Sequence, residues 1–394
     1  MVIAAPYPEG AITRLAEHLE TRGVSLAVYE PSRAFSAAAA ALVPGRLRKP
    51  LQERLRLAGG ARSTRTGVAP SLEVIRLSAR LPGMDRVFPR PMDTVKASFD
   101  RAVAKRLKPP VGTLIGMPGA ALASFSAAQD ARKVLHAVDG HPEALNTLLG
   151  DVYGRSADAE RVPERQVARI GAELELADLV LTPSRIAARQ MVERGVERES
   201  IVTVPYGVDT LRFRPAKEVP RGGSVKLVYV GQISYRKGIP FLLDAARGQS
   251  FEVELIGPVV APELLRDLPA NVRHRATLPH GALSGVLARS DALVLPSIED
   301  SYGLVVLEGI AAGLPIVVTE QVGAADLFDV GAPGEAVQAA DAIGLRAALN
   351  RVRPLSWDAR RANAASLRAL QTWDSYGDAV LRLLTDGTPK NEER

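Results

Sequence analysis

Short apolar runs and stretches with helical spacing alternate along this chain. Runs of strand length lie at residues 24–29, 133–137 and 225–230, and between them apolar residues recur every three or four positions, as on one face of a helix. Strands that alternate with helices predict a parallel sheet covered by helices. No run reaches the roughly 18 apolar residues that a membrane-spanning helix needs. We therefore expect an α/β fold without a transmembrane segment.

The most regular of these patterns covers residues 293–319. An apolar run ends at Pro296, a polar loop follows, and the helical spacing after the loop stops at Gly313. This order places Glu299 and Asp300 at the carboxyl end of a strand, where parallel sheets bind ligands. A simpler explanation is that the two acids keep the loop soluble and cap the following helix.

The helix after this loop is expected to begin near Tyr302 or Gly303. Its free N–H groups and the positive end of its dipole would face the ligand crevice. A second loop follows the strand at 225–230 and has Lys237 just before a helix that begins at Ile239. Glycines in that loop admit a close approach and the lysine supplies a point charge, so both loops indicate a phosphate or diphosphate site.

The length of 394 residues suffices for two domains with separate cores. Residues 217–224 are rich in proline and glycine and mark a linker. We predict an N-terminal domain over residues 1–215 and a C-terminal domain over residues 216–370. Residues 371–394 are expected to form a terminal amphipathic helix and a polar tail.

Composition and absent motifs exclude several classes of protein. The chain has no cysteine, which excludes disulfides and cysteine metal sites and fits a reducing cytoplasm. Its N-terminus opens directly into a strand, so we expect no secretory signal. The sequence contains neither the G-x-G-x-x-G motif of dinucleotide-binding oxidoreductases nor the G-x-x-x-x-G-K-[ST] motif of P-loop NTPases. It also lacks a D-x-D pair, so we expect chemistry without a bound metal.

The net charge of +6 is concentrated in one basic stretch that contains a single acid, Glu53. Its basic residues are Arg46, Arg48, Lys49, Arg54, Arg56, Arg62 and Arg65. Such a stretch suits an anionic membrane surface, and a solvated helical face or loop explains it equally well. No aromatic residue lies between Arg46 and Arg65 to stack on bases, so nucleic acid is not an expected partner.

Asp300, Glu308 and Lys237 resemble the conserved motif residues of a known protein family. Asp300 and Glu308 are separated by seven residues and resemble the E-x7-E segment of retaining family-4 glycosyltransferases (glycosyl transferases group 1), with Asp300 in place of the first glutamate. Lys237 matches the phosphate lysine of that family, and Gln232 stands where an arginine is usual. The resemblance implies the GT-B fold, in which two Rossmann-like domains face each other across a cleft and a C-terminal helix crosses back to the N-terminal domain.

The resemblance also implies roles for individual residues. It makes Asp300 and His141 the catalytic residues that hold the donor sugar, with His136 as the alternative histidine, and it assigns Glu308 to the ribose hydroxyls. A lone histidine in a turn is more often structural, and Gly10 is as well explained by a strand-to-helix turn as by a ligand. The implied donor-binding residues are Gly10, Gln232, Arg236, Lys237, Ser301, Tyr302, Gly303, Leu304 and Glu308.

We therefore expect a retaining, metal-independent glycosyltransferase without a cofactor, which moves a sugar from a nucleotide-diphosphate sugar to a glycan, lipid or small-molecule acceptor. A bacterial surface polysaccharide or glycolipid is the expected product. The expected location is the cytoplasm, with the basic stretch on the inner face of a membrane. Two alternatives stay open: a nucleotide-sugar epimerase of the same fold, and a catalytically lapsed nucleotide-sugar-binding subunit. Gln232 and Asp300 motivate the second alternative because both depart from the family pattern.

Overall fold

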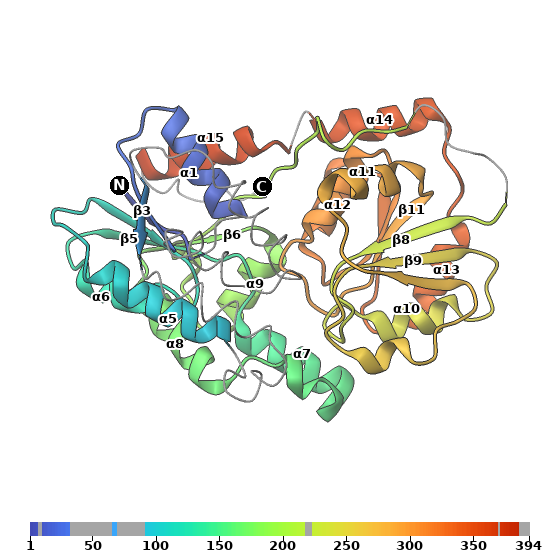
Figure 1. The fold of residues 1–394 in the computed structure, drawn as a ribbon, viewed down its shortest axis with the longest axis horizontal. Helices are drawn as coiled ribbons and strands as arrows, with labels where there is room; N and C mark the ends of the chain where they lie inside the picture. The colour runs from blue at the N-terminus through green and yellow to red at the C-terminus, as the bar shows by residue number, and fades with distance from the viewer. Residues whose placement is uncertain (7–9, 32–64, 69–90, 217–222, 369–370, 386–394) are drawn as a thin grey trace, which may run out of the picture.

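A computed structural model describes residues 1–6, 10–31, 65–68, 91–216, 223–368 and 371–385 of the chain. Most of the basic stretch and most of the predicted linker lie outside the described residues, as does the polar tail beyond Thr385. The described residues form two parallel sheets, each covered by helices, and the two sheets lie side by side along the long axis of the molecule (Figure 1).

The N-terminal sheet has seven strands in the order β3-β2-β1-β4-β5-β6-β7, and every pairing is parallel. The predicted strand at residues 24–29 begins later, at Ala27, and runs on to Pro31. In register, Ile3 of β1 lies between Val28 of β2 and Ile115 of β4. The strands are β1 (Val2–Ala4), β2 (Ala27–Pro31), β3 (Arg65–Val68), β4 (Thr113–Gly116), β5 (Arg132–His136), β6 (Leu179–Thr182) and β7 (Ile201–Thr203).

Helices of the N-terminal domain follow these strands and bury one apolar face each. In α1, for example, Ile12, Leu15 and Leu19 are fully buried, as expected from their helical spacing. The described helices of this domain are α1 (Ala11–Thr21), α5 (Pro91–Ala104), α6 (Leu122–Ala127), α7 (Pro142–Tyr153), α8 (Glu164–Leu176) and α9 (Arg185–Glu193), with 3₁₀ turns η1 (Gly154–Glu160) and η2 (Arg198–Ser200).

The C-terminal sheet has six parallel strands in the order β10-β9-β8-β11-β12-β13. The order changes direction between β8 and β11, and open parallel sheets bind ligands at such a switch point. The strands are β8 (Lys226–Val230), β9 (Glu252–Ile256), β10 (Val272–Arg275), β11 (Ala292–Leu295), β12 (Ile316–Thr319) and β13 (Gly334–Val337). Their helices are α10 (Ile239–Ala246), α11 (His280–Arg289), α12 (Leu304–Ala311), α13 (Ala342–Arg351) and α14 (Trp357–Arg368), with 3₁₀ turns η3 (Pro262–Leu265) and η4 (Gly323–Val330).

The last helix, α15 (Trp373–Thr385), crosses back to the N-terminal domain and packs on α1, whereas α14 stays on the C-terminal domain (Figure 1). His18 of α1 lies within hydrogen-bond distance of Asp374 (3.2 Å) and Asp378 (2.9 Å) of α15. The crossing segment also forms a parallel bridge between Thr372 and Val208. No helix in the described part of the chain combines the length and apolar character needed to cross a membrane.

Candidate functional site

Two loops at the carboxyl ends of β8 and β11 pack closely against each other. The first ends at Gly238, whose φ of 68° is in the left-handed region and whose added Cβ would lie 1.8 Å from the carbonyl oxygen of Pro296. The second loop is tied to the first by a hydrogen bond from the Ile298 N–H to the carbonyl oxygen of Arg236 (2.9 Å). A glycine at 238 is therefore required both by conformation and by space, and the contact brings Lys237 next to the acids of the second loop.

Four charged residues of these loops form two pairs at this point. Lys237 Nζ lies 2.7 Å from Asp300 Oδ2, and Arg236 Nε donates to Glu299 Oε2 at 2.7 Å. The Arg236 guanidinium also reaches Asp139 of the N-terminal domain, 3.2 Å away. Each cation of the predicted phosphate site is thus already paired with a carboxylate.

Burial controls the ionisation of this cluster. It raises the pKa of Glu299 above the usual value, although Arg236 acts in the opposite direction. Burial also opposes ionisation of Asp139, but the positive charge of Arg236, with Lys96 and Lys237, lowers the Asp139 pKa below its usual value. The carboxylates in turn raise the pKa of Arg236 against the effect of its own burial, so the guanidinium stays charged.

Helix α12 begins at Leu304, directly after Gly303, which agrees with the predicted start. Gly303 is the N-cap, with a φ of 80°, and no side chain of the described residues caps the first turn. Leu304, the first helical residue, is 38% exposed. Ser301 and Tyr302 contact the N-terminal domain. Ser301 Oγ donates a hydrogen bond to the carbonyl oxygen of Val138 at 2.7 Å. The Tyr302 hydroxyl donates to the carbonyl oxygen of Tyr206 at 3.1 Å.

Glu308 lies on α12, one to two turns after its start, and is partly buried. Burial raises the pKa of its carboxyl to about 7, although Arg212 acts to lower it. This is the group of the candidate site whose charge changes near neutral pH.

The two histidines of the predicted sugar site have different surroundings. His141 is the N-cap of α7, and its Nδ1 accepts a hydrogen bond from the Glu143 N–H at 3.2 Å. Burial lowers its pKa. His136 is almost fully buried, and its Nε2 lies 2.5 Å from the hydroxyl of Tyr376 on α15. His136 therefore joins β5 to the crossover helix, whereas His141 lies two residues from Asp139, at the edge of the charged cluster.

Two predicted donor-binding residues, Gly10 and Gln232, have contacts other than those of the charged pairs Lys237–Asp300 and Arg236–Glu299. Gly10 is the exposed N-cap of α1, and its φ of 107° favours glycine for conformational reasons alone. Gln232 is exposed, and its carbonyl oxygen accepts a hydrogen bond from the Tyr229 hydroxyl at 2.6 Å.

Two acids of the N-terminal domain also lie at this site, and no sequence pattern indicated them. One is Asp139, in the turn after β5. The other is Glu160, whose carboxylate accepts from the Tyr235 N–H at 2.7 Å and the Arg236 N–H at 2.9 Å. No local pattern marks Glu160, because its partners are 75 and 76 residues away along the chain.

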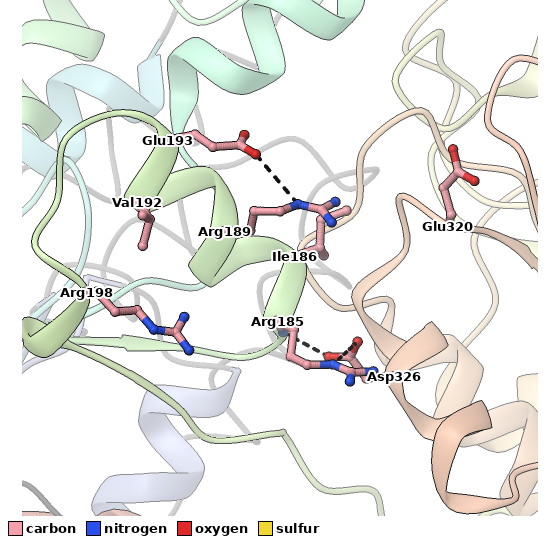
Figure 2. Close-up of a pocket in the computed structure, with 8 residues that line it drawn as sticks. All are labelled: Arg185, Ile186, Arg189, Val192, Glu193, Arg198, Glu320 and Asp326. Carbon is pink, nitrogen blue, oxygen red and sulfur yellow. Dashed lines mark hydrogen bonds and ion pairs between the residues drawn. The ribbon is translucent and has the colours of Figure 1, made fainter. Parts of the chain in front are cut away.

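A cavity of about 690 Å³ is lined by none of the predicted donor-binding residues (Figure 2). It lies between α9 and the C-terminal domain. Arg185 binds Asp326 at 3.0 Å on one side and Arg189 lies 3.8 Å from Glu193 on the other, while Glu320 faces them across the gap. With Arg198, three arginines of the lining balance its three acids, so the cavity has no net charge that would select an anion. Within the described ranges no group of three or more histidine, cysteine, aspartate or glutamate residues could hold a metal ion.

The C-terminal domain matches a family model. Residues 212–363, which include both loops of the site and α12, match the model of glycosyl transferases group 1. The resemblance predicted from Lys237, Asp300 and Glu308 is therefore confirmed for this part of the chain.

Two curated relatives show the extent of the similarity. The glycogen synthase of Mycobacterium tuberculosis (strain CDC 1551 / Oshkosh) is 34% identical over 188 residues, which are 44% of this chain and 45% of the relative. A D-inositol 3-phosphate glycosyltransferase of Thermomonospora curvata is 28% identical over 261 residues, 57% of this chain and 61% of the relative. The aligned part is thus less than two thirds of either relative's length.

Solved structures match almost the whole chain. Sucrose-phosphate synthase from Thermosynechococcus elongatus has a TM-score of 0.70 at 16% identity and covers 98% of both chains. Anabaena HepE, solved in complex with UDP and glucose, has a TM-score of 0.63 at 14% identity and covers 98% of this chain and 99% of its own. The fold predicted from the sequence, two Rossmann-like domains of the GT-B type with a helix that crosses back, is confirmed.

Proposed function

We propose that this protein is a retaining, metal-independent glycosyltransferase that uses a nucleotide-diphosphate sugar as donor. One observation carries the proposal: Lys237, Asp300 and the uncapped start of α12 come together at the switch point between β8 and β11. A cation, a helix N-terminus and an adjacent carboxylate suit a diphosphate joined to a sugar.

The proposed roles follow from the contacts of each residue. The donor diphosphate binds Lys237, Arg236 and the free N–H groups of α12, and so replaces Asp300 as the partner of Lys237. The Asp300 carboxylate is then free to accept hydrogen bonds from the donor sugar, together with His141. The carboxylate of Glu308 accepts the two ribose hydroxyl protons.

Transfer needs a site closed to water. The hydrogen bonds from Ser301 to Val138 and from Ser184 to the carbonyl oxygen of Ser301 hold the two domains together beside the donor. Such closure favours transfer to an acceptor hydroxyl over hydrolysis. A glycan, lipid or small-molecule acceptor is proposed, in the synthesis of a surface polysaccharide or glycolipid.

The test is nucleotide release from a panel of UDP-, GDP- and ADP-sugars in EDTA, with and without a bacterial extract of lipids and glycans. Release that requires the extract identifies the donor and a metal-independent transfer. Release that requires added divalent metal contradicts metal independence, and conversion of a UDP-sugar without any acceptor identifies an epimerase instead.

A second candidate function is a nucleotide-sugar-binding subunit without turnover. Arg236 and Lys237 are both paired with carboxylates. Gln232, which is exposed, stands where an arginine is usual. Both features favour weaker phosphate binding. Nucleotide binding without release from any sugar of the panel would support this candidate.

We also propose that the basic stretch from Arg46 to Arg65 binds the inner, anionic face of a membrane, in the cytoplasm. Vesicle sedimentation tests this proposal, and we expect binding to phosphatidylglycerol vesicles that salt weakens. Equal sedimentation with neutral vesicles would contradict it.

A further inference from the structure

Another cavity, of about 320 Å³, is lined by α11 and by the strands β8, β9 and β10 of the C-terminal domain. Two of its lining residues, Lys226 and Glu252, are the first residues of β8 and β9, and a third, Arg273, is the second residue of β10. The loop that contains Lys237 follows the other end of β8. The cavity therefore lies toward the opposite end of the sheet from the proposed donor site.

The strands present charged side chains to this cavity. In register, Lys226 of β8 lies beside Glu252 of β9, and Glu254 of β9 lies beside Arg273 of β10. Parallel sheets that are covered by helices are normally apolar on both faces. Lys226 and Arg273 are exposed, so this part of the sheet is open to solvent and charged.

The charges that line the cavity are unevenly paired. One ion pair joins Arg275 to Glu254 at 2.9 Å. Three cations of the lining have no carboxylate partner among the described residues: Lys226, Arg273 and Arg289. The Arg289 guanidinium lies back along α11, because a Cβ added at Gly285 would be 3.4 Å from its Nη1. Four cations and two acids line the cavity, which leaves a net of two positive charges.

We propose that this cavity binds a phosphorylated polyol, such as a soluble sugar phosphate, as a ligand separate from the donor. A phosphomonoester carries a charge of about −1.5 to −2 at pH 7, which matches the net charge of the lining. The guanidinium groups of Arg273 and Arg289 suit bidentate binding of phosphate oxygens, and the Glu252 carboxylate suits the polyol hydroxyls. The volume agrees with a small ligand, since pockets for such ligands begin at roughly 300 Å³.

The head group of phosphatidic acid is a phosphomonoester too, but the cavity favours the soluble ligand. A membrane surface is a continuous layer of negative charge, and it would repel the two acids of the cavity, Glu252 and Glu254. The proposal does not rest on the transferase function, because no proposed donor-binding residue lines this cavity.

Isothermal titration calorimetry with glucose 6-phosphate as the probe tests the proposal. We expect glucose 6-phosphate to bind at least roughly tenfold more tightly than glucose, because the neutral sugar gains no charge-assisted hydrogen bonds from the arginines. Inorganic phosphate should bind more weakly than glucose 6-phosphate, since it lacks the polyol. Equal affinities for glucose and glucose 6-phosphate would overturn the proposal.

A double variant locates the binding. Arg273→Ala combined with Arg289→Ala should weaken binding of glucose 6-phosphate by at least roughly tenfold. Both side chains are exposed, so we expect the variant to fold, which thermal unfolding checks. Arg266→Ala is the matched control, because Arg266 is an exposed arginine of the same domain that does not line the cavity. Absence of binding to the wild-type protein, or unchanged binding to the double variant, would contradict the proposed site.

Two further arms separate this site from other phosphate sites. Excess UDP should leave the binding of glucose 6-phosphate unchanged, and displacement by UDP would place the probe on the donor loops instead. Vesicles of phosphatidic acid test the lipid source by sedimentation. Sedimentation that requires Arg273 and Arg289, without binding of glucose 6-phosphate, would overturn the soluble ligand. Failure of UDP to bind at all would count against the proposed donor site alone.

Discussion

Glu308 is the residue whose charge state has the clearest consequence for the proposed donor site. Burial raises the pKa of its carboxyl to about 7, so the group is mostly neutral at pH 6 and mostly ionised at pH 8. Only the ionised form accepts two charge-assisted hydrogen bonds from ribose hydroxyls. Donor affinity should therefore depend on pH in this range.

We expect the donor or its nucleotide to bind the wild-type protein more tightly at pH 8 than at pH 6. Glu308→Gln should weaken binding at pH 8 by roughly tenfold, the usual effect of losing hydrogen bonds to a charged group, and should remove most of the pH dependence. Isothermal titration at both pH values measures the effect. Equal affinities of the two proteins at pH 8 would exclude Glu308 from the ribose site.

At the scale of the element, the loop between β8 and α10 depends on Gly238. Alanine at this position would have its Cβ 1.8 Å from the carbonyl oxygen of Pro296, in addition to the strain of a positive φ. Gly248→Ala is the matched control, since Gly248 has a φ of 73° and no atom within 4 Å of an added Cβ.

We expect the control to lose about 1 kcal/mol of stability, from backbone strain alone. Gly238→Ala should lose at least about 2 kcal/mol more, because the two loops must separate, and it should also lose donor binding. Thermal unfolding of the two variants gives the comparison. Similar unfolding temperatures would mean that the contact with Pro296 adapts without cost.

The docking of the crossover helix α15 should depend on pH through His136. Burial lowers the pKa of His136 to about 4, below its usual value of 6.5. The unfolded chain therefore binds more protons than the folded one between these values, so stability is complete above about pH 6.5 and falls as the pH drops toward 4.

The loss expected from this shift is about 3 kcal/mol between pH 7 and pH 4. Unfolding of His136→Gln should show a smaller difference between these two pH values than the wild-type protein. His274→Gln, in the C-terminal domain, is the control and should behave as wild type. An identical pH dependence in all three proteins would contradict the role given to His136.

Several described contacts hold the two domains of the molecule against each other. Glu160 of the N-terminal domain accepts from two consecutive backbone N–H groups of the C-terminal domain, and Asp139 binds Arg236 across the same boundary. These contacts join the domains through the loop that contains Lys237. Closure and the donor site are thus physically coupled.

Glu160→Ala should weaken closure by about 2 kcal/mol, the typical value for hydrogen bonds to a charged group. We expect a larger radius of gyration in small-angle X-ray scattering of the protein without ligand. Glu164→Ala, in the first turn of α8, is the matched control and should leave the radius unchanged. An unchanged radius for Glu160→Ala would show that other contacts suffice for closure.

The sequence alone indicated the alternation of strands and helices, the two loops with Lys237 and Asp300, and the start of α12 near Gly303. These features depend on local patterns: the spacing of apolar residues, the position of glycines and the charge of a few side chains. Strand length and helical spacing are properties of consecutive residues, so they can be read without the fold. The class of fold followed from them, together with the resemblance carried by Asp300 and Glu308.

Only the tertiary structure decided which charges meet and which groups are buried. Three contacts join residues far apart in sequence: Arg236 pairs with Glu299 and Asp139, Glu160 binds the Arg236 loop, and His136 contacts Tyr376 of the crossover helix. The raised pKa of Glu308 likewise depends on how completely neighbouring elements exclude water from α12. Contacts between distant residues and the burial of a side chain both depend on how the whole molecule packs. A local pattern of residues therefore cannot predict them.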